Sequence, residues 1–401
     1  MSFDLNNKIF FKLFFSILLA SIIVFLSMQE NLWPNIWGSL QVPPNIIPFS
    51  DFKAHVFFYQ CTEIGIDINN QDCIYINDGN AKINTHPKIW VYLFGLFNLD
   101  NFLIYNFSIL LILSLYFYII FQLFEKFKNS SSKIVLLILL LSTSNFLLIE
   151  RLATDIIIFI LVYLTLSIRS KLFQSIIIFI GFILKYYPIF LVSLFSEKKK
   201  FLFIFLAFVI SFFYFFYLEE VSSLNKNMLE MALPIAYGAR TMLKAFYHLS
   251  MEYNFFINDN NLDFYRNLVV ILFSIYVFII ILFGYFVDGK KKNENSFDKF
   301  FLAGASIYVG SFIVGANVDY RLIFLFFTIP YIINLKSKNI KYLLIFSYII
   351  SFNSFTFMGS PILSKAFFLK AFFVFSCKFI ILSLLSFLIG LQMKKINFFK
   401  F

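Results

Sequence analysis

The sequence predicts an all-α, polytopic integral membrane protein, and three observations support that prediction. The 401-residue chain is 60% hydrophobic and 14% charged, whereas about a quarter of the residues of a soluble domain are charged. Apolar runs of about 17–25 residues, the length of a helix that crosses a hydrocarbon core, recur along most of the chain. These runs are continuously apolar rather than alternating, which excludes the strands of a membrane β-barrel.

The apolar segments predict about ten membrane spans. They are residues 9–28, 103–124, 134–149, 153–168, 200–218, 267–287, 300–316, 322–335, 342–357 and 366–392. The first segment follows Lys8 and Lys12 and has no small-residue cleavage site after it, so we expect a retained span rather than a signal peptide. The whole chain is expected to form one integral-membrane domain.

Two long polar segments, 29–102 and 219–266, are expected to be outer loops. Within the first loop, residues 88–98 (KIWVYLFGLFN) are too short to cross a membrane. They are therefore expected to lie at the interface or to dip into it.

Short basic loops predict the orientation, because lysine and arginine concentrate in cytoplasmic loops. With the N-terminus inside, loops 125–133 and 169–171 are cytoplasmic. Loop 197–200 and the later basic loops are also cytoplasmic if the apolar stretch 172–195 enters the membrane and returns to the same side as a re-entrant hairpin. Its tip would be Lys185-Tyr186-Tyr187-Pro188, since proline disrupts a helix. Both termini are then cytoplasmic, and 20 of the 33 Lys and Arg residues lie inside.

The net charge of +11 does not predict a nucleic-acid partner, because the lysines lie in short loops between spans. Nucleotide-binding, dinucleotide-binding and zinc motifs are absent from the sequence. Cys61 and Cys73 share the first outer loop, where they form either a disulfide or two thiols, and Cys377 lies in the last apolar run. A bacterial inner membrane is the expected location, and the endoplasmic reticulum is the alternative.

The first outer loop carries an acid close to the membrane, Asp51, in the segment PFSDFKAH. A carboxylate there could act as the general base that deprotonates a sugar hydroxyl. The alternative is structural, with Ser50 or Asp51 as the N-cap of an amphipathic helix over 51–61. His55 lies one turn later on the same helical face.

Three further charged residues are candidates because ionisable groups at membrane depth are costly and are functional by default. Arg151 and Asp155, in Glu150-Arg-Leu-Ala-Thr-Asp155, are four apart and so predict neighbours on one helix face. They form either an ion pair that caps the fourth span or an arginine with its orienting acid. Lys185, at the centre of an apolar stretch, is predicted to hold a lipid phosphate or to extend towards the headgroups.

A tight polar turn, Asn317-Val-Asp319-Tyr320-Arg321, separates two apolar segments. The arginine fork matches a phosphate group. The alternative is an Asp319–Arg321 pair at the interface beside an anchoring tyrosine. Four basic residues of the second outer loop could add positive charge for a lipid-linked anion: Arg240, Lys244, His248 and Arg266.

The segments SDF (50–52), THPKIWVYL (85–93), ERLATD (150–155), GFILKYYP (181–188) and NVDYRLIF (317–324) together resemble the GT-C superfamily of integral-membrane glycosyltransferases. The likeness is to glycosyltransferase family 87, the polyprenyl-phosphate-mannose type, and to its relatives from bacterial polysaccharide clusters. It extends to about residue 330. It implies a GT-C-like bundle and transfer of a sugar from a polyprenyl-phosphate donor to a glycan or lipid acceptor on the non-cytoplasmic face.

The resemblance also implies roles for particular residues. Asp51 would be the catalytic base, Lys185 and Arg321 with Tyr320 would bind the donor phosphate, and Arg151 with Asp155 would line the site. His55, Glu150 and Asp319 are expected beside them. Many GT-C enzymes carry paired acids in the first loop, and this chain carries one in SDF, so a divalent-metal requirement stays open. An O-antigen or capsule polymerase and a non-enzymatic flippase of lipid-linked glycans are the alternative functions.

Overall fold

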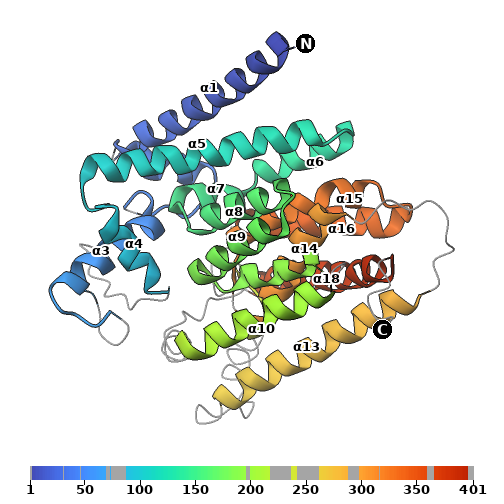
Figure 1. Cartoon of the computed structure of the whole chain (residues 1–401). Helices are drawn as coiled ribbons and strands as arrows, with labels where there is room; N and C mark the ends of the chain where they lie inside the picture. Colours follow the sequence, from blue (N-terminus) through green and yellow to red (C-terminus); the bar gives the residue numbers. More distant parts are fainter. Residues whose placement is uncertain are drawn as a thin grey trace. The chain divides into compact units, whose positions relative to one another are not determined.

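The structure of the protein is a computed structural model. It describes residues 2–29, 31–45, 47–68, 73, 87–195, 199–216, 236–241, 262–287, 298–315, 317–358 and 365–395. Helices make up most of these residues (Figure 1). The α-helices are α1 (Ser2–Ser27), α2 (Leu32–Ser39), α3 (Ser50–Glu63), α4 (Ile89–Leu96), α5 (Phe102–Lys126), α6 (Ser130–Leu140), α7 (Thr143–Arg151), α8 (Asp155–Ser167), α9 (Lys171–Leu184), α10 (Lys199–Phe216), α13 (Leu262–Phe286), α14 (Lys299–Val314), α15 (Ile329–Ile333), α16 (Lys338–Phe352), α17 (Ser354–Met358) and α18 (Lys365–Lys395).

Two 3-10 helices and a pair of very short strands complete the described elements. The 3-10 helices are η1 (Tyr187–Phe195) and η3 (Asp319–Thr328). Strands β1 (Ala236–Tyr237) and β2 (Asn317–Val318) pair in antiparallel register.

Four helices of the described chain are long and apolar enough to cross a membrane: Lys8–Ser27, Phe102–Lys126, Asn267–Phe286 and Leu369–Lys395. A fifth span is counted if α6 and α7, which meet at an angle of 56°, form one broken crossing. The prediction of an all-α membrane protein is therefore supported, whereas the predicted count of about ten spans is not.

Several apolar segments that predict spans are short or interrupted helices in the structure. Helices α8, α9 and α14 have 13, 14 and 16 residues, fewer than the roughly 20 of a typical crossing. Segment 322–335 is the end of a 3-10 helix followed by the five-residue α15, in which Pro330 occupies the first turn. Apolar runs thus mark buried half-helices as well as membrane crossings.

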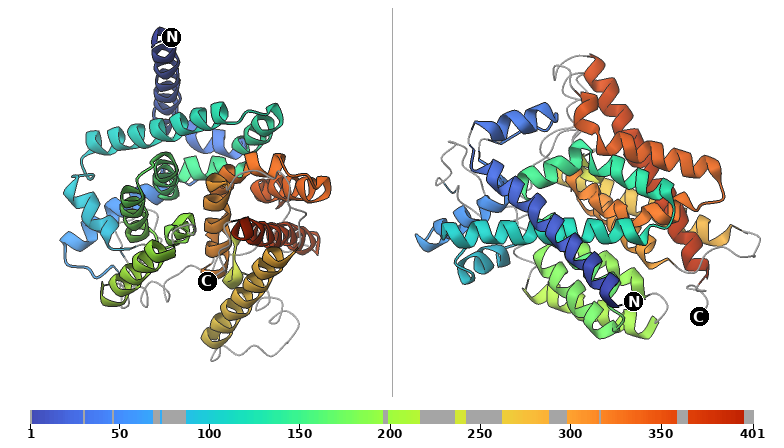
Figure 2. Two further views of the ribbon diagram at one scale, coloured as in Figure 1. Left: turned by 45° about the vertical axis from the view of Figure 1, so that its right-hand side comes forward. Right: turned by 90° about the horizontal axis from the view of Figure 1, so that it is seen from above.

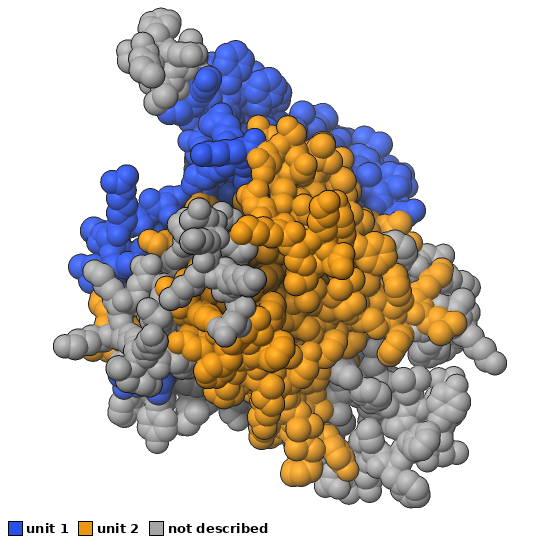
Figure 3. Space-filling view, turned by 90° about the vertical axis from the view of Figure 1, so that its right-hand side faces the viewer, with its two compact units in different colours: residues 1–128, 146–188, 205–229 blue, residues 129–145, 189–204, 230–401 orange. Residues whose placement is uncertain are grey.

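The chain divides into two compact units, shown in separate colours in Figure 3. Unit 1 comprises residues 1–128, 146–188 and 205–229, and unit 2 comprises residues 129–145, 189–204 and 230–401. The expectation of a single integral-membrane domain stays a prediction.

In unit 1, α1 packs along α5, α8 lies against both α5 and α9, and the short α3 and α4 pack together (Figure 2). Helix α4 confirms that residues 88–98 are too short to span, because it has eight residues. Its Trp90 donates a hydrogen bond from Nε1 to the carbonyl of Leu184 at 2.9 Å. Helix α4 is therefore fastened to the end of α9.

In unit 2, α13 lies side by side with α18, and α14 packs against η3 and α18 (Figure 2). Two glycines allow the close approach of α13 and α18. A Cβ at Gly284 would lie 2.2 Å from the carbonyl oxygen of Phe387, and one at Gly390 would lie 2.1 Å from that of Ile281. Small residues at contacts of this kind are typical of helix packing in membranes.

The break predicted near Lys185 is present. Helix α9 ends at Leu184, Lys185 is extended with φ −153°, and the chain resumes as the 3-10 helix η1. Pro188 packs back onto α9, since a Cβ at Gly181 would lie 3.1 Å from the Cβ of Pro188. The second half of the stretch is thus a 3-10 rather than an α-helix, and the return of the chain to the cytoplasmic side stays a prediction.

Cys61 and Cys73 form a disulfide, which decides between the two alternatives for this pair. Both cysteines are fully buried in a small core with Phe58, Ile68 and Val91, which joins α3 and its following loop to α4. The bridge therefore ties α3, the helix that carries Asp51, to the loop that follows it. Cys377 is a buried thiol in α18.

Candidate functional site

Helix α3 carries Asp51 and His55, as the sequence predicts, but it does not begin with a side-chain cap. Its N-cap is Phe49, and no side-chain capping bond is formed there. Neither Ser50 nor Asp51 is therefore the N-cap, and the structural alternative for Asp51 is wrong. Phe49 is a buried residue with φ +55°, a left-handed conformation that costs a non-glycine residue about 1–2 kcal/mol.

Two backbone and side-chain contacts hold this strained start of α3 in place. The Phe49 N–H donates to the carbonyl oxygen of Glu150 at 3.1 Å. The Glu150 side chain is fully buried, and its Oε1 accepts the N–H of Asn45 at 2.9 Å. Glu150 thus anchors the segment that leads into α3, and it fixes where Asp51 stands.

Arg151 lies between two carboxylates. Its Nε is 2.9 Å from Oε2 of Glu150, and its Nη1 is 3.9 Å from Oδ1 of Asp51. The Arg151 and Asp51 side chains are 23% and 28% exposed. Asp51 is therefore a carboxylate that solvent can reach, and it lies beside a guanidinium group.

Arg151 and Asp155 do not share a helix face, and that prediction is wrong. Helix α7 ends at Arg151, and α8 begins at Asp155. Between them Leu152 has φ +45° and is buried, while the Ala153 N–H bonds to the Leu148 carbonyl at 3.2 Å. This reversal of the chain after α7 removes the one-turn spacing on which the prediction depended.

Asp155 pairs instead with Lys185. The two side chains meet at 2.5 Å between Nζ and Oδ2, and both are buried. The Tyr187 hydroxyl donates to the other carboxylate oxygen at 2.7 Å. The break after α9 therefore turns Lys185 and Tyr187 onto the first residue of α8. A charge buried in this way needs a partner of opposite sign, and Asp155 supplies it.

His55 lies among aromatic rings in unit 1. Its ring stacks on Trp90 with centroids 5.3 Å apart, and Phe94 lies at the same distance. Burial, with the positive charge of Lys185 as a smaller cause, lowers the pKa of His55 to about 3. His55 is therefore neutral near pH 7, and it can donate or accept a hydrogen bond but is not a cation for a phosphate.

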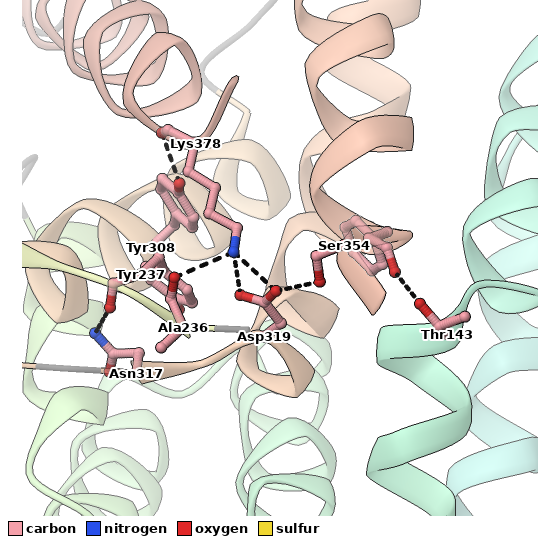
Figure 4. A network of polar contacts seen from close by, with 9 residues as sticks. Thr143, Ala236, Tyr237, Tyr308, Asn317, Asp319, Ser354 and Lys378 are labelled. Atoms are coloured by element: carbon pink, nitrogen blue, oxygen red, sulfur yellow. Dashed lines mark hydrogen bonds and ion pairs between the residues drawn. The ribbon is translucent and has the colours of Figure 1, made fainter. Parts of the chain in front are cut away.

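Unit 2 contains a second buried polar cluster, centred on Lys378 and Asp319 (Figure 4). Lys378 Nζ lies 2.6 and 2.8 Å from the two carboxylate oxygens of Asp319. It also donates to the carbonyl of Ala236 in β1 at 3.1 Å, and the Ser354 hydroxyl donates to Asp319. Asp319 thus pairs with Lys378 rather than with Arg321, so the predicted alternative of an Asp319–Arg321 pair is wrong.

Arg321 and Tyr320 follow directly in η3 and are partly buried. Arg321 donates through Nη1 to the side-chain oxygen of Asn317. The Asn317 amide donates in turn to the carbonyl of Ser311 at 2.6 Å. Arg321 is therefore held by Asn317, which is itself hydrogen-bonded to the end of α14.

Lys378 is a buried, paired charge that was not among the residues predicted from the sequence. The sequence does contain the signal for Lys378, because burying a charged lysine within a 27-residue apolar span is as costly as burying Lys185 in its apolar stretch. Its partner Asp319 lies 59 residues away in sequence, so the pairing needed the fold.

The structure thus distributes the predicted site residues over both units. Unit 1 brings together Asp51, His55, Glu150, Arg151, Asp155 and Lys185, whereas Asp319, Tyr320 and Arg321 belong to unit 2. Of the basic residues of the second outer loop, Lys244 and His248 lie outside the described residues, Arg240 follows β1, and Arg266 lies in α13.

Within the described ranges, no group of three or more His, Cys, Asp or Glu side chains is arranged to hold a metal ion. Comparison with known proteins adds no identification. No family model matches the chain, and no curated protein or solved structure is significantly similar to it.

Proposed function

We propose that the protein is a GT-C-like membrane glycosyltransferase. It would move a sugar from a polyprenyl-phosphate donor to a lipid-linked or surface-glycan acceptor on the non-cytoplasmic face. The observation that supports this proposal best is the pair formed by Asp51 and Arg151, a partly exposed carboxylate 3.9 Å from a guanidinium group. In the same unit, the buried Lys185 contributes a further cation at the break after α9.

The proposed reaction inverts the anomeric carbon in one displacement. Asp51 accepts the proton of the acceptor hydroxyl, and the acceptor oxygen attacks the anomeric carbon of the donor. The bond from that carbon to the phosphate oxygen breaks, and its electron pair leaves with polyprenyl phosphate. A base on the incoming hydroxyl and positive charge on the leaving phosphate are what such a transfer requires.

The proposal assigns the donor phosphate to Lys185, Tyr320 and Arg321. The lining of the site would come from His55, Glu150, Arg151, Asp155 and Asp319. Lys185 belongs to unit 1, whereas Tyr320 and Arg321 belong to unit 2. His55, which is neutral, would hydrogen-bond a sugar or an acceptor rather than pair with the phosphate.

The proposal places both termini on the cytoplasmic side of a bacterial inner membrane, as the short basic loops of the sequence predict. The Cys61–Cys73 disulfide is consistent with an outer loop in an oxidising compartment.

The variant Asp51→Asn tests the assignment of the base. The purified protein in lipid nanodiscs receives polyprenyl-phosphate donors that carry different hexoses or pentoses, with membrane glycolipid extract as the acceptor. Mass spectrometry measures the polyprenyl phosphate released. We expect Asp51→Asn to lower release at least 100-fold with unchanged expression and insertion. The matched control is Asp100→Asn, an exposed acid of the same outer loop, which should retain wild-type activity.

Unchanged release by Asp51→Asn would remove Asp51 from the role of base. The alternative functions have different products in the same preparation. A polymerase would lengthen a lipid-linked repeat unit, and a flippase in sealed vesicles would move a labelled lipid-linked glycan without forming a glycosidic bond.

A further inference from the structure

We infer that Lys378 is a positioning residue that orients Arg321 towards the phosphate of a prenyl-phosphate ligand. This inference rests on the proposed function for the class of ligand, while the geometry comes from unit 2 itself. Lys378 is fully buried in the middle of α18 and does not need to touch the ligand. It acts through Asp319, two residues before Arg321 in η3.

Lys378 connects segments of unit 2 that are far apart in sequence (Figure 4). Its ammonium group binds both oxygens of Asp319 and the carbonyl of Ala236. Its own carbonyl accepts the hydroxyl of Tyr308 in α14 at 2.8 Å. Strand β1, helix α14 and the start of η3 are therefore held by one side chain and its backbone.

Two residues of the turn that precedes Arg321, Asn317 and Asp319, are each held in place by contacts with other segments of unit 2. On one side, Asn317 pairs in β2 with Tyr237 of β1, and its amide holds the carbonyl of Ser311. On the other side, Asp319 is held by Lys378 and by Ser354. Arg321 then reaches back to Asn317. A guanidinium fork whose base is immobilised in this way loses less conformational entropy when it binds a phosphate.

Stability alone is a weak explanation for such a pair. Moving two charges from water to the interior is costly, and a buried ion pair is often no better for stability than well-packed apolar side chains of similar volume. In a span the cost is larger still, which is why an ionisable residue at membrane depth indicates a functional role. The double variant Asp319→Asn/Lys378→Met removes both charges together and so avoids leaving one of them unpaired.

The test is a double-mutant cycle between this neutral pair and Arg321→Ala. Binding of farnesyl phosphate to the full-length protein in nanodiscs is the first readout, and donor KM and kcat in the release assay are the second. We expect Asp319→Asn/Lys378→Met to weaken farnesyl phosphate binding and to raise donor KM about tenfold, with kcat at saturating donor changed less than twofold. Arg321→Ala should weaken binding to a similar extent.

The two effects should not add, because the neutral pair acts through the arginine. Adding Arg321→Ala to the neutral pair should therefore change binding less than twofold further. Additive losses would overturn the inference, as would normal binding by either variant. Lys370→Met, at an exposed position of the same helix, is the control and should behave as wild type.

The outcomes for the inference and for the proposed function are separable. In one outcome, the wild type binds farnesyl phosphate and the variant cycle is non-additive, but no polyprenyl phosphate is released from any sugar donor. That outcome contradicts the glycosyltransferase and leaves the positioning role intact. Wild-type protein that transfers sugar while the cycle is additive contradicts the positioning role alone. The single variant Lys378→Met would leave a buried, unpaired Asp319 carboxylate and could prevent folding. The cycle therefore uses the neutral pair Asp319→Asn/Lys378→Met, which removes both charges.

Discussion

The Nζ of Lys185 lies 2.5 Å from a carboxylate oxygen of Asp155. Asp155 is the first residue of α8, and Lys185 directly follows α9, at the break between α9 and η1. Both side chains are buried, and Tyr187 donates to the second oxygen of the same carboxylate. The relationship makes the irregular backbone at Lys185 a structural requirement, because a continuing helix would carry the lysine away from its partner.

The Asp155–Lys185 pair predicts a difference between single and double variants. Lys185→Met leaves a buried carboxylate without its cation and should lower the free energy of unfolding by about 3–5 kcal/mol. Asp155→Asn/Lys185→Met should recover most of that loss, since neither charge remains. Thermal unfolding in detergent, followed by static light scattering, measures both. Equal losses in the single and double variants would show that packing rather than charge is responsible.

His55 predicts a pH dependence of stability. Its pKa of about 3 in the folded protein is below the value of about 6.5 expected when it is unfolded. Between these values the unfolded chain binds more protons, so stability is greatest above pH 6.5 and falls as the pH is lowered towards 3, by at most about 1.4 kcal/mol per unit.

The variant His55→Phe should flatten this part of the profile while keeping a ring against Trp90. Unfolding temperatures of the wild type and the variant at pH 7, 6, 5 and 4 provide the comparison. A profile for His55→Phe that is as steep as that of the wild type would contradict a neutral, buried His55.

Gln41 predicts a stabilising substitution. It is exposed, has φ +60°, and follows α2 in a turn where the Val42 N–H bonds to the Trp37 carbonyl at 2.9 Å. Glycine adopts this conformation without a Cβ penalty and is the preferred residue there. Gln41→Gly should therefore raise the free energy of unfolding by roughly 1 kcal/mol, because it removes a left-handed penalty of about 1–2 kcal/mol and loses part of that gain to the greater freedom of glycine in the unfolded chain. Gln41→Ala should not raise it. A lower unfolding temperature for the glycine variant would count against the left-handed turn.

The disulfide predicts a count of reactive thiols. The chain has three cysteines, and the structure pairs Cys61 with Cys73 and leaves Cys377 as a thiol. Alkylation of the denatured protein should therefore add one group without reduction and three after reduction, as mass spectrometry would measure. Three groups without reduction would place the first outer loop in a reducing compartment or leave the bridge unformed.

The parts of the fold that could be predicted from sequence are those with a local cause. The break before Pro188 follows from the proline itself and is present. The helix over 51–61 is also present, but its start is held by Glu150 rather than by the predicted side-chain cap. The count of spans could not be predicted in this way. An apolar run such as 322–335 has the same composition whether it forms a crossing or, as here, a buried 3-10 helix followed by a short α-helix.

The pairing of charges at the candidate site could not be predicted either. Arg151 and Asp155 have the spacing of helix neighbours, but Leu152 adopts a left-handed conformation that is uncommon for leucine and carries no signal in the sequence. Asp319 finds its cation 59 residues later in α18. Sequence identified most of these ionisable residues because their burial is costly, whereas their partners depend on tertiary structure.

The complete burial of Cys61 and Cys73 has a consequence for handling the protein during purification. Thiol–disulfide exchange requires a thiolate to approach a sulfur atom, so dithiothreitol acts on molecules in which α3 and α4 have already separated. The rate at which the bridge is lost in reductant is then a measure of how often the two helices separate, and a ligand seated against Asp51 would slow it.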